Sequence, residues 1–99
     1  MEPQPFGEAD AAAFANPPLA WRPETWFHFL AGNVAAKGIT ADLEAISGAG
    51  ISGIQLFHGQ FGGPWPGVVP QIQCLSPEWD AAINHAATEC RRLGLDFTM

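Results

Sequence analysis

The sequence predicts an α/β fold in which parallel strands alternate with helices. Short apolar runs at 25–30, 51–57 and 95–99 are typical of buried strands, because none shows a clear alternation of apolar and polar residues. Stretches with helical spacing separate these runs. The resulting order, strand–helix–strand–helix–strand, indicates either an incomplete (β/α)8 TIM barrel or the start of an open doubly wound sheet.

The first part of the chain leads into the first strand. Residues 1–24 are expected to form an extended lead-in, with one helical turn over 9–14 that Asn16-Pro17-Pro18 ends. Residues 25–99 are then expected to hold the first three strands and two helices. The first strand, 25–30, is rich in aromatic residues and is predicted to be buried on both faces.

Helix signals follow each of the first two strands. Thr40 is predicted to cap the first helix, with Asp42 in its first turn and Gly48 near its end. Ser76-Pro77-Glu78 is a strong start signal for the second helix, and Gly94 is its stop. Apolar positions with helical spacing lie between the two signals: Trp79, Ala82, Ile83, Ala86, Cys90 and Leu93.

The barrel is favoured over the doubly wound sheet. A nucleotide-binding doubly wound fold would carry a glycine-rich motif after its first strand, and residues 31–38 contain neither GxGxxG nor GxxxxGK[ST]. The chain ends inside its third predicted strand. We therefore expect these residues to be the β1-α1-β2-α2-β3 part of a larger barrel, truncated at its C-terminus, with unpaired edges that favour aggregation of the isolated chain.

Composition and charge exclude some classes of partner. The chain has 10 acidic and 4 basic residues and a formal net charge of −6, which argues against a nucleic-acid surface and an anionic membrane surface. No apolar run approaches the ~20 residues that cross a bilayer, and no signal peptide is visible. Cys74 and Cys90 lack ligand spacing and are expected to be free thiols.

Candidate site residues lie where strands end, because chemistry in such barrels sits at the carboxyl ends of the strands. The candidates for substrate binding are His28, Asn33, His58 and Gln60. Each has a structural alternative: a core histidine, a turn residue, or a residue that stabilises the long loop 58–75. No carboxylate ends a strand, so we predict no catalytic and no metal-binding residue. Loop aromatics (Phe61, Trp65) are expected to stack on a sugar or pack on the rim.

Several segments in order resemble one enzyme family. These are Phe14-Ala15-Asn16-Pro17-Pro18, Arg22-Pro23-Glu24-Thr25-Trp26-Phe27-His28-Phe29-Leu30-Ala31-Gly32-Asn33-Val34, Gly38-Ile39-Thr40-Ala41-Asp42-Leu43-Glu44-Ala45, Ala49-Gly50-Ile51-Ser52-Gly53-Ile54-Gln55-Leu56-Phe57, Leu75-Ser76-Pro77-Glu78-Trp79 and Leu93-Gly94-Leu95. Together they resemble the N-terminal part of the catalytic barrel of glycoside hydrolase family 106, the α-L-rhamnosidases. The first strand departs from the family pattern, which has more tryptophan where Phe27 and Phe29 stand.

The resemblance implies a large exported enzyme, secreted or periplasmic, that removes terminal rhamnose from polysaccharides or glycosides. It implies inversion by two glutamates, ~6.5–9.5 Å apart, with calcium at the site. Those glutamates would lie beyond Met99, so this chain alone is expected to be inactive and to need the remainder of the barrel as its partner. The alternatives are a fragment of a barrel sugar lyase or isomerase, and a non-catalytic truncated gene product.

Overall fold

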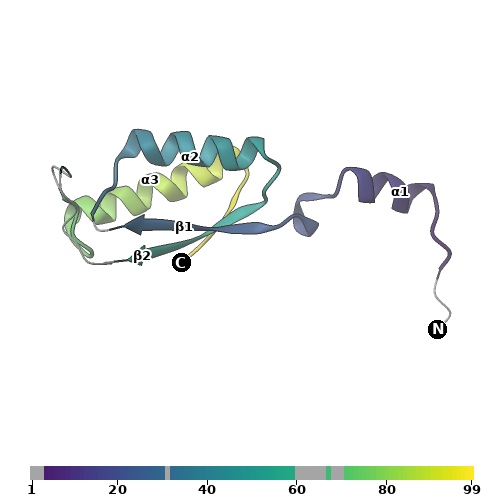
Figure 1. Ribbon diagram of the computed structural model, residues 1–99, viewed down its shortest axis with the longest axis horizontal. Helices are drawn as coiled ribbons and strands as arrows, with labels where there is room; N and C mark the ends of the chain where they lie inside the picture. The colour runs from purple at the N-terminus through teal and green to yellow at the C-terminus, as the bar shows by residue number, and fades with distance from the viewer. Residues whose placement is uncertain (1–3, 31, 60–66, 68–70) are drawn as a thin grey trace.

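The computed structural model describes residues 4–30, 32–59, 67 and 71–99 of the chain (Figure 1). The elements follow the order α1 (Glu8–Ala15), a 3₁₀ turn η1 (Leu19–Trp21), β1 (Glu24–Leu30), α2 (Ala36–Gly48), β2 (Gly53–Gly59), α3 (Pro77–Leu93) and β3 (Asp96–Thr98). The strand–helix alternation from β1 onward confirms the predicted α/β class.

The three strands form one parallel sheet in the order β1-β2-β3. β1 pairs with β2 along its whole length, from Glu24 opposite Gly53 to Leu30 opposite Gly59. β3 pairs with the first half of β2. Helices α2 and α3 lie together on one face of this sheet, and no described element covers the other face (Figure 1).

The hydrophobic core lies between the sheet and these two helices. Its largest fully buried side chains are Phe29, Leu43, Ile54 and Cys90. Alternate residues of the strands point away from the helices, and Trp26 and Phe57 there are 65% and 45% exposed. The prediction that β1 is buried on both faces is therefore wrong for the described residues, because helices cover only one side.

Helix α3 forms as its start and stop signals predict. The Ser76 hydroxyl oxygen accepts a hydrogen bond from the Trp79 backbone N–H at 3.2 Å, and Pro77 occupies the first position of the helix. Gly94 ends the helix in the left-handed region, with φ of 72°. The buried face of the helix includes Trp79 and Cys90. Burial raises the pKa of the Cys90 thiol, whereas Cys74 is exposed, and both are free as predicted.

Helix α2 begins four residues before its predicted cap. Ala35 is the residue before the helix, and its carbonyl oxygen accepts from the Ile39 N–H at 2.9 Å. The prediction that Thr40 caps the helix is therefore wrong, because 36–39 can continue the helix backwards and Ile39 contributes a buried side chain there. Asp42 correspondingly lies in the helix interior and not in its first turn.

The second strand lies two residues later than predicted. It starts at Gly53 and runs to Gly59, so His58 is a strand residue and not the first residue of the loop. The preceding residue, Ser52, is buried and binds the end of the lead-in: its hydroxyl donates to the Arg22 carbonyl oxygen at 3.0 Å. Gly53 must be small because a Cβ there would lie 2.7 Å from the Asp96 Cβ.

The lead-in is more helical than predicted. Residues 8–15 form α1, which projects away from the sheet and helices (Figure 1), and none of its residues is buried. Arg22 attaches this segment to the body of the domain. Its guanidinium donates to the Pro17 carbonyl oxygen at 2.7 Å and to the Asn16 side-chain oxygen at 2.9 Å.

A polar network joins α2 and α3 on their solvent side. The Thr40 hydroxyl lies 2.8 Å from His85 Nε2 and 3.3 Å from Glu89 Oε1, and Arg92 binds both Glu89 and Glu44. The hydrogen bond from Arg92 holds the pKa of the Glu89 carboxyl below its usual range. Thr40 thus joins the two helices in place of the capping role that its position in the sequence suggested.

Candidate functional site

The carboxyl ends of β1 and β2 bring together three separate segments of the chain. Leu30 and Gly59 end the two strands side by side. The segment before α3 returns to the same edge, where the Ile72 backbone N–H donates to the Gly32 carbonyl oxygen at 3.1 Å. Gly32 has φ of 75°, and a Cβ there would lie 3.0 Å from the Ile72 carbonyl oxygen. Glycine is therefore required where β1 meets this returning segment.

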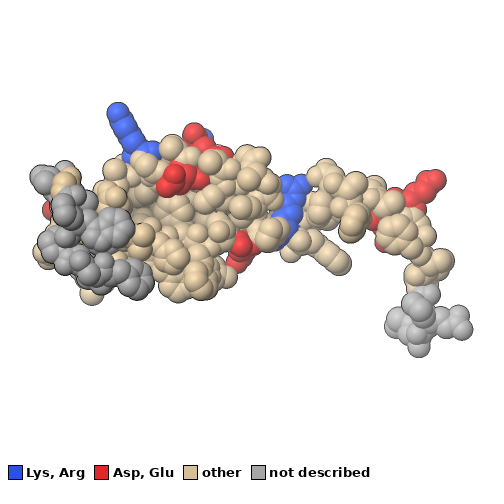
Figure 2. Space-filling view, in the orientation of Figure 1, with Lys and Arg blue, Asp and Glu red and all other residues tan. Residues whose placement is uncertain are grey.

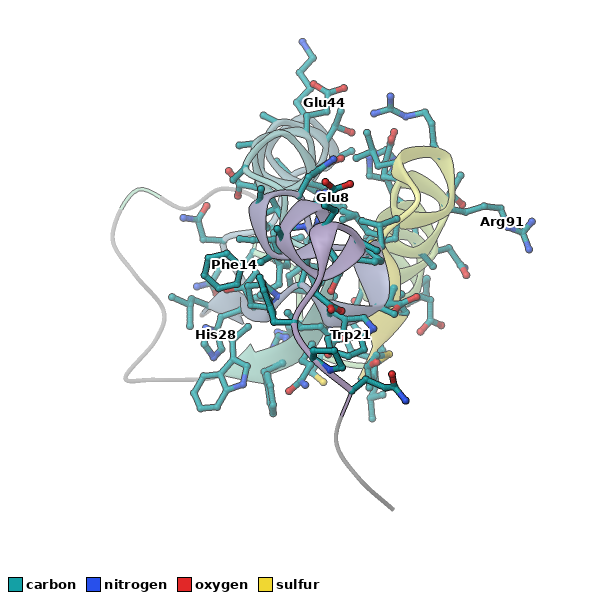
Figure 3. All side chains as sticks on the ribbon, turned by 90° about the vertical axis from the view of Figure 1, so that its right-hand side faces the viewer. Glu8, Phe14, Trp21, His28, Glu44 and Arg91 are labelled. Carbon is teal, nitrogen blue, oxygen red and sulfur yellow. The ribbon has the colours of Figure 1, made fainter. Side chains whose placement is uncertain are left out.

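His28 lies on the open face of the sheet, on the side away from the helices (Figure 3). Its ring centroid is 5.7 Å from that of Trp26, at an interplanar angle of 87°, and 5.7 Å from that of Phe57. No hydrogen bond to His28 exists among the described residues. The residue is exposed on the same face as Trp26, so it is not a core histidine within the described part of the molecule.

Asn33 follows β1 in a tight turn. Its backbone N–H donates to the Leu30 carbonyl oxygen at 2.9 Å, and its side chain is exposed. Asn33 and His28 line the same hollow of about 230 Å³ along the free edge of β1. The other residues that line this hollow are Phe27, Phe29, Val34, Ala35, Gly38, Ile39 and Asp42. The structure therefore brings two of the predicted substrate-binding residues together.

The Asp42 carboxylate in this hollow was missed as a site candidate. Its place in the sequence indicated only a capping role on a helix predicted to start at Thr40. The longer α2 places it one turn before Ile46 on a helix that packs beside β1. A correct prediction of the helix start would have indicated this position, because a helix that begins at Ala36 places Asp42 beside the edge of β1.

His58 lies on the other face of the sheet from His28. Its strand partner is the buried Phe29, and its Nδ1 atom accepts a hydrogen bond from the Trp79 indole N–H at 3.1 Å. This bond places the proton of the neutral imidazole on Nε2. The Nε2 atom is buried and has no partner among the described residues. The contact with α3 differs from the loop-stabilising role that was the structural alternative for His58, and a contact with ligand stays a prediction.

The predicted site residue Gln60 lies outside the described residues, as do the loop aromatics Phe61 and Trp65. Nothing in the structure tests these three predictions.

Acidic and basic side chains are distributed unequally around the sheet. Figure 2 shows Lys and Arg over the helix layer and where the lead-in joins the body. Figure 3 places Arg91 and Glu44 on the helix side, away from His28. At the start of β1, Glu24 accepts a hydrogen bond from the Gln55 amide at 3.2 Å. The open face thus has a polar end near Glu24 and an aromatic end near His28.

The described residues do not supply a calcium site. They contain no cluster of three or more His, Cys, Asp or Glu side chains that could hold a metal ion. Calcium requires six to eight oxygen ligands. No helix among the described residues is both long and apolar enough to cross a membrane.

Comparison with known proteins identifies a consistent set of relatives. The family model described as alpha-L-rhamnosidase, glycoside hydrolase family 106, matches residues 15–99. The solved structure of a rhamnosidase from Novosphingobium sp. PP1Y is similar with a TM-score of 0.80 and 37% sequence identity, covering 87% of this chain. A protein of Formosa agariphila named "Putative beta-glucuronidase" is 37% identical over 87 residues, which are 88% of this chain.

The chain is short compared with these relatives. It spans 8% of the rhamnosidase chain and 7% of the Formosa agariphila protein. The matched region begins at residue 15, so most of α1 precedes it.

Proposed function

The chain belongs to glycoside hydrolase family 106, the α-L-rhamnosidases, and from this premise we propose that it forms the first three strands of a (β/α)8 catalytic barrel. The whole protein then hydrolyses α-L-rhamnosides in polysaccharides or smaller glycosides. The observation that carries the proposal is the TM-score of 0.80 to a rhamnosidase over 87% of this chain. Three parallel strands with helices on one face are the arrangement that a closed barrel continues.

Within this barrel the chain would supply one wall of the sugar pocket. The substrate-binding residues would be His28 and Asn33 at the hollow beside β1, with Gln60 and His58 at the end of β2. The two glutamates of an inverting reaction would come from later strands, and so would the calcium ligands, since the described residues do not fit them. The chain alone would be inactive, and the whole enzyme would be secreted or periplasmic.

A second candidate is hydrolysis of a β-glucuronide, which the name of the Formosa agariphila relative favours. A glucuronide carries a carboxylate, which enzymes bind with Arg or Lys. Among the described residues, no Lys or Arg lines the hollow that contains His28 and Asn33, and Arg22 is bound to Asn16 and Pro17 at the far end from His28. The described part of the site therefore supports a neutral sugar.

The test is hydrolysis by the full-length protein that contains these residues. We expect release of nitrophenol from p-nitrophenyl α-L-rhamnoside, little release from the β-D-glucuronide, and none from either substrate by the 99-residue chain. Proton NMR of the first-formed sugar should show the inverted anomer. A full-length protein that prefers the glucuronide would replace the first candidate with the second, and an inactive full-length protein would contradict both.

A further inference from the structure

Three side chains form a contiguous aromatic platform on the open face of the sheet: Trp26, His28 and Phe57. His28 and Phe57 are direct partners in the parallel register of β1 and β2, so their rings lie side by side. The Trp26 ring contacts both, with centroid distances of 5.7 Å to His28 and 5.4 Å to Phe57. Each of the three residues is exposed, and Trp26 and Phe57 are among the large apolar side chains that the described structure leaves open to solvent.

The polar atoms of the platform are inconsistent with a dry barrel core. Both nitrogens of His28 and the indole N–H of Trp26 lack hydrogen-bond partners among the described residues. Burial of such groups against hydrocarbon is unfavourable unless each finds a partner. An occupant that combines apolar surface with hydroxyl or similar groups would satisfy both the rings and these polar atoms. A sugar ring has both, because its C–H groups lie on one face and its hydroxyls point outward.

The position of the platform also favours a ligand. His28 and Phe57 are in the second halves of their strands, which is the end where barrel enzymes bind substrates. His28 also lines the hollow that contains Asn33, so the platform is continuous with the candidate site.

The charges of the described residues favour a neutral sugar. Within the described residues no Lys or Arg contacts the platform, while Glu24 lies on the same face two residues before Trp26. An anionic sugar would find no cation beside the platform, and a neutral sugar with a large apolar face would fit the rings. A 6-deoxy sugar has such a face, because a methyl group replaces its terminal hydroxymethyl group.

We infer that Phe57 stacks on the apolar face of a neutral 6-deoxy sugar while His28 hydrogen-bonds one of its hydroxyls. Trp26 is a positioning residue whose ring contacts the other two from the side of the platform nearer the start of β1. The inference rests on the proposed glycosidase function and adds the residues that select the sugar.

The experiment compares variants of the full-length protein on p-nitrophenyl α-L-rhamnoside and on the corresponding α-L-mannoside, which differs only by a hydroxyl on the terminal carbon. The variants are Phe57→Ala, Phe57→Leu, His28→Asn and Trp26→Phe. The control is Phe14→Ala, because Phe14 is 86% exposed on α1 and lies before the matched region. Circular dichroism checks that each variant is folded.

We expect Phe57→Ala to raise KM for the rhamnoside about tenfold with a smaller change in kcat, and to lower the preference for rhamnoside over mannoside about tenfold. His28→Asn should raise KM about tenfold through the lost hydrogen bond. Trp26→Phe should change KM less than either, since a ring remains. If Phe57→Ala does not fold, Phe57→Leu keeps the bulk but lacks the flat face, and it should show the same loss of preference.

The inference fails if the wild type is active and the Phe57 and His28 variants match Phe14→Ala in KM and preference. The proposed function fails if the wild type has no glycosidase turnover. In that case saturation-transfer NMR with free L-rhamnose still tests whether the platform binds the sugar. A signal that is present with wild type and lost with Phe57→Ala supports the inference. The absence of a signal with wild type contradicts it.

Discussion

The two faces of the sheet differ in how their side chains are satisfied. On the helix face, Phe29, Leu43 and Ile54 are buried, and the Trp79 indole N–H donates a hydrogen bond to His58 Nδ1. On the open face, Trp26 and His28 present polar atoms without partners among the described residues. The same strands supply both faces, since successive residues of a strand point to opposite sides.

The difference indicates that the two faces of each strand have different roles. The helix face stabilises the domain by burial of apolar area, whereas the open face retains groups that would be costly to bury. Substitutions on the two faces should therefore change different properties, namely the free energy of unfolding on one face and sugar binding on the other.

The largest stability effect should come from the helix face. Leu43→Ala removes a side chain that is 0% exposed and should lower the free energy of unfolding by about 2–5 kcal/mol. Leu19→Ala, at a side chain that is 53% exposed, should change it by about 0.5 kcal/mol or less. Urea denaturation of the full-length protein measures both. Phe57→Ala is the critical comparison, because a loss as large as that of Leu43→Ala would show that the open face is a packed core.

A smaller effect is expected where β2 meets β3. Gly53→Ala places a Cβ 2.7 Å from the Asp96 Cβ and from the Asp96 carbonyl oxygen, so the strands must separate, at a cost of about 1–3 kcal/mol. The matched control is Gly38→Ala in α2, where no atom lies within 4 Å of the new Cβ. That variant should be more stable than wild type by about 0.5–1 kcal/mol. Equal effects of the two substitutions would show that the contact with Asp96 does not limit the packing of β3.

The smallest effect should come from the polar network between the helices. Arg92 lowers the pKa of Glu89 in the folded protein, so the ionised carboxylate stabilises the fold above the unfolded pKa of about 4.5. That contribution is lost as pH falls through the folded value. The thermal midpoint of wild type should therefore fall more steeply below pH 4.5 than that of Glu89→Gln. Parallel pH profiles for the two proteins would exclude a role for this carboxylate.

Most of the fold could be predicted from local signals. Ser76-Pro77-Glu78 and Gly94 defined α3 because capping is decided by neighbouring residues. The start of α2 could not be found in this way. Ala35 is a weak cap, and the helix is continued backwards by the burial of Ile39, which depends on the sheet. The two-residue shift of β2 likewise depends on Ser52, whose partner Arg22 is thirty residues away.

The candidate site was only partly predictable. The strand ends directed attention to His28 and Asn33, which line one hollow, and their role in substrate binding stays a prediction. The sequence could not show on which face of β2 His58 would lie, because a shift of one residue in a strand exchanges the two faces. Phe57 was not a site candidate for the same reason. It belongs to the apolar run at 51–57, and the sequence does not show whether an aromatic strand residue faces the helices or the open side of the sheet.

Arg22 has a practical consequence for handling this protein. Its guanidinium donates hydrogen bonds to Asn16 and Pro17, and its carbonyl oxygen accepts one from the Ser52 hydroxyl. These three bonds fix the path of the chain just before the sheet. A reporter domain or affinity label attached upstream of Asn16 would leave the body in a set direction, at the end opposite His28. Such a fusion would keep the end that carries His28 clear for immobilised assays.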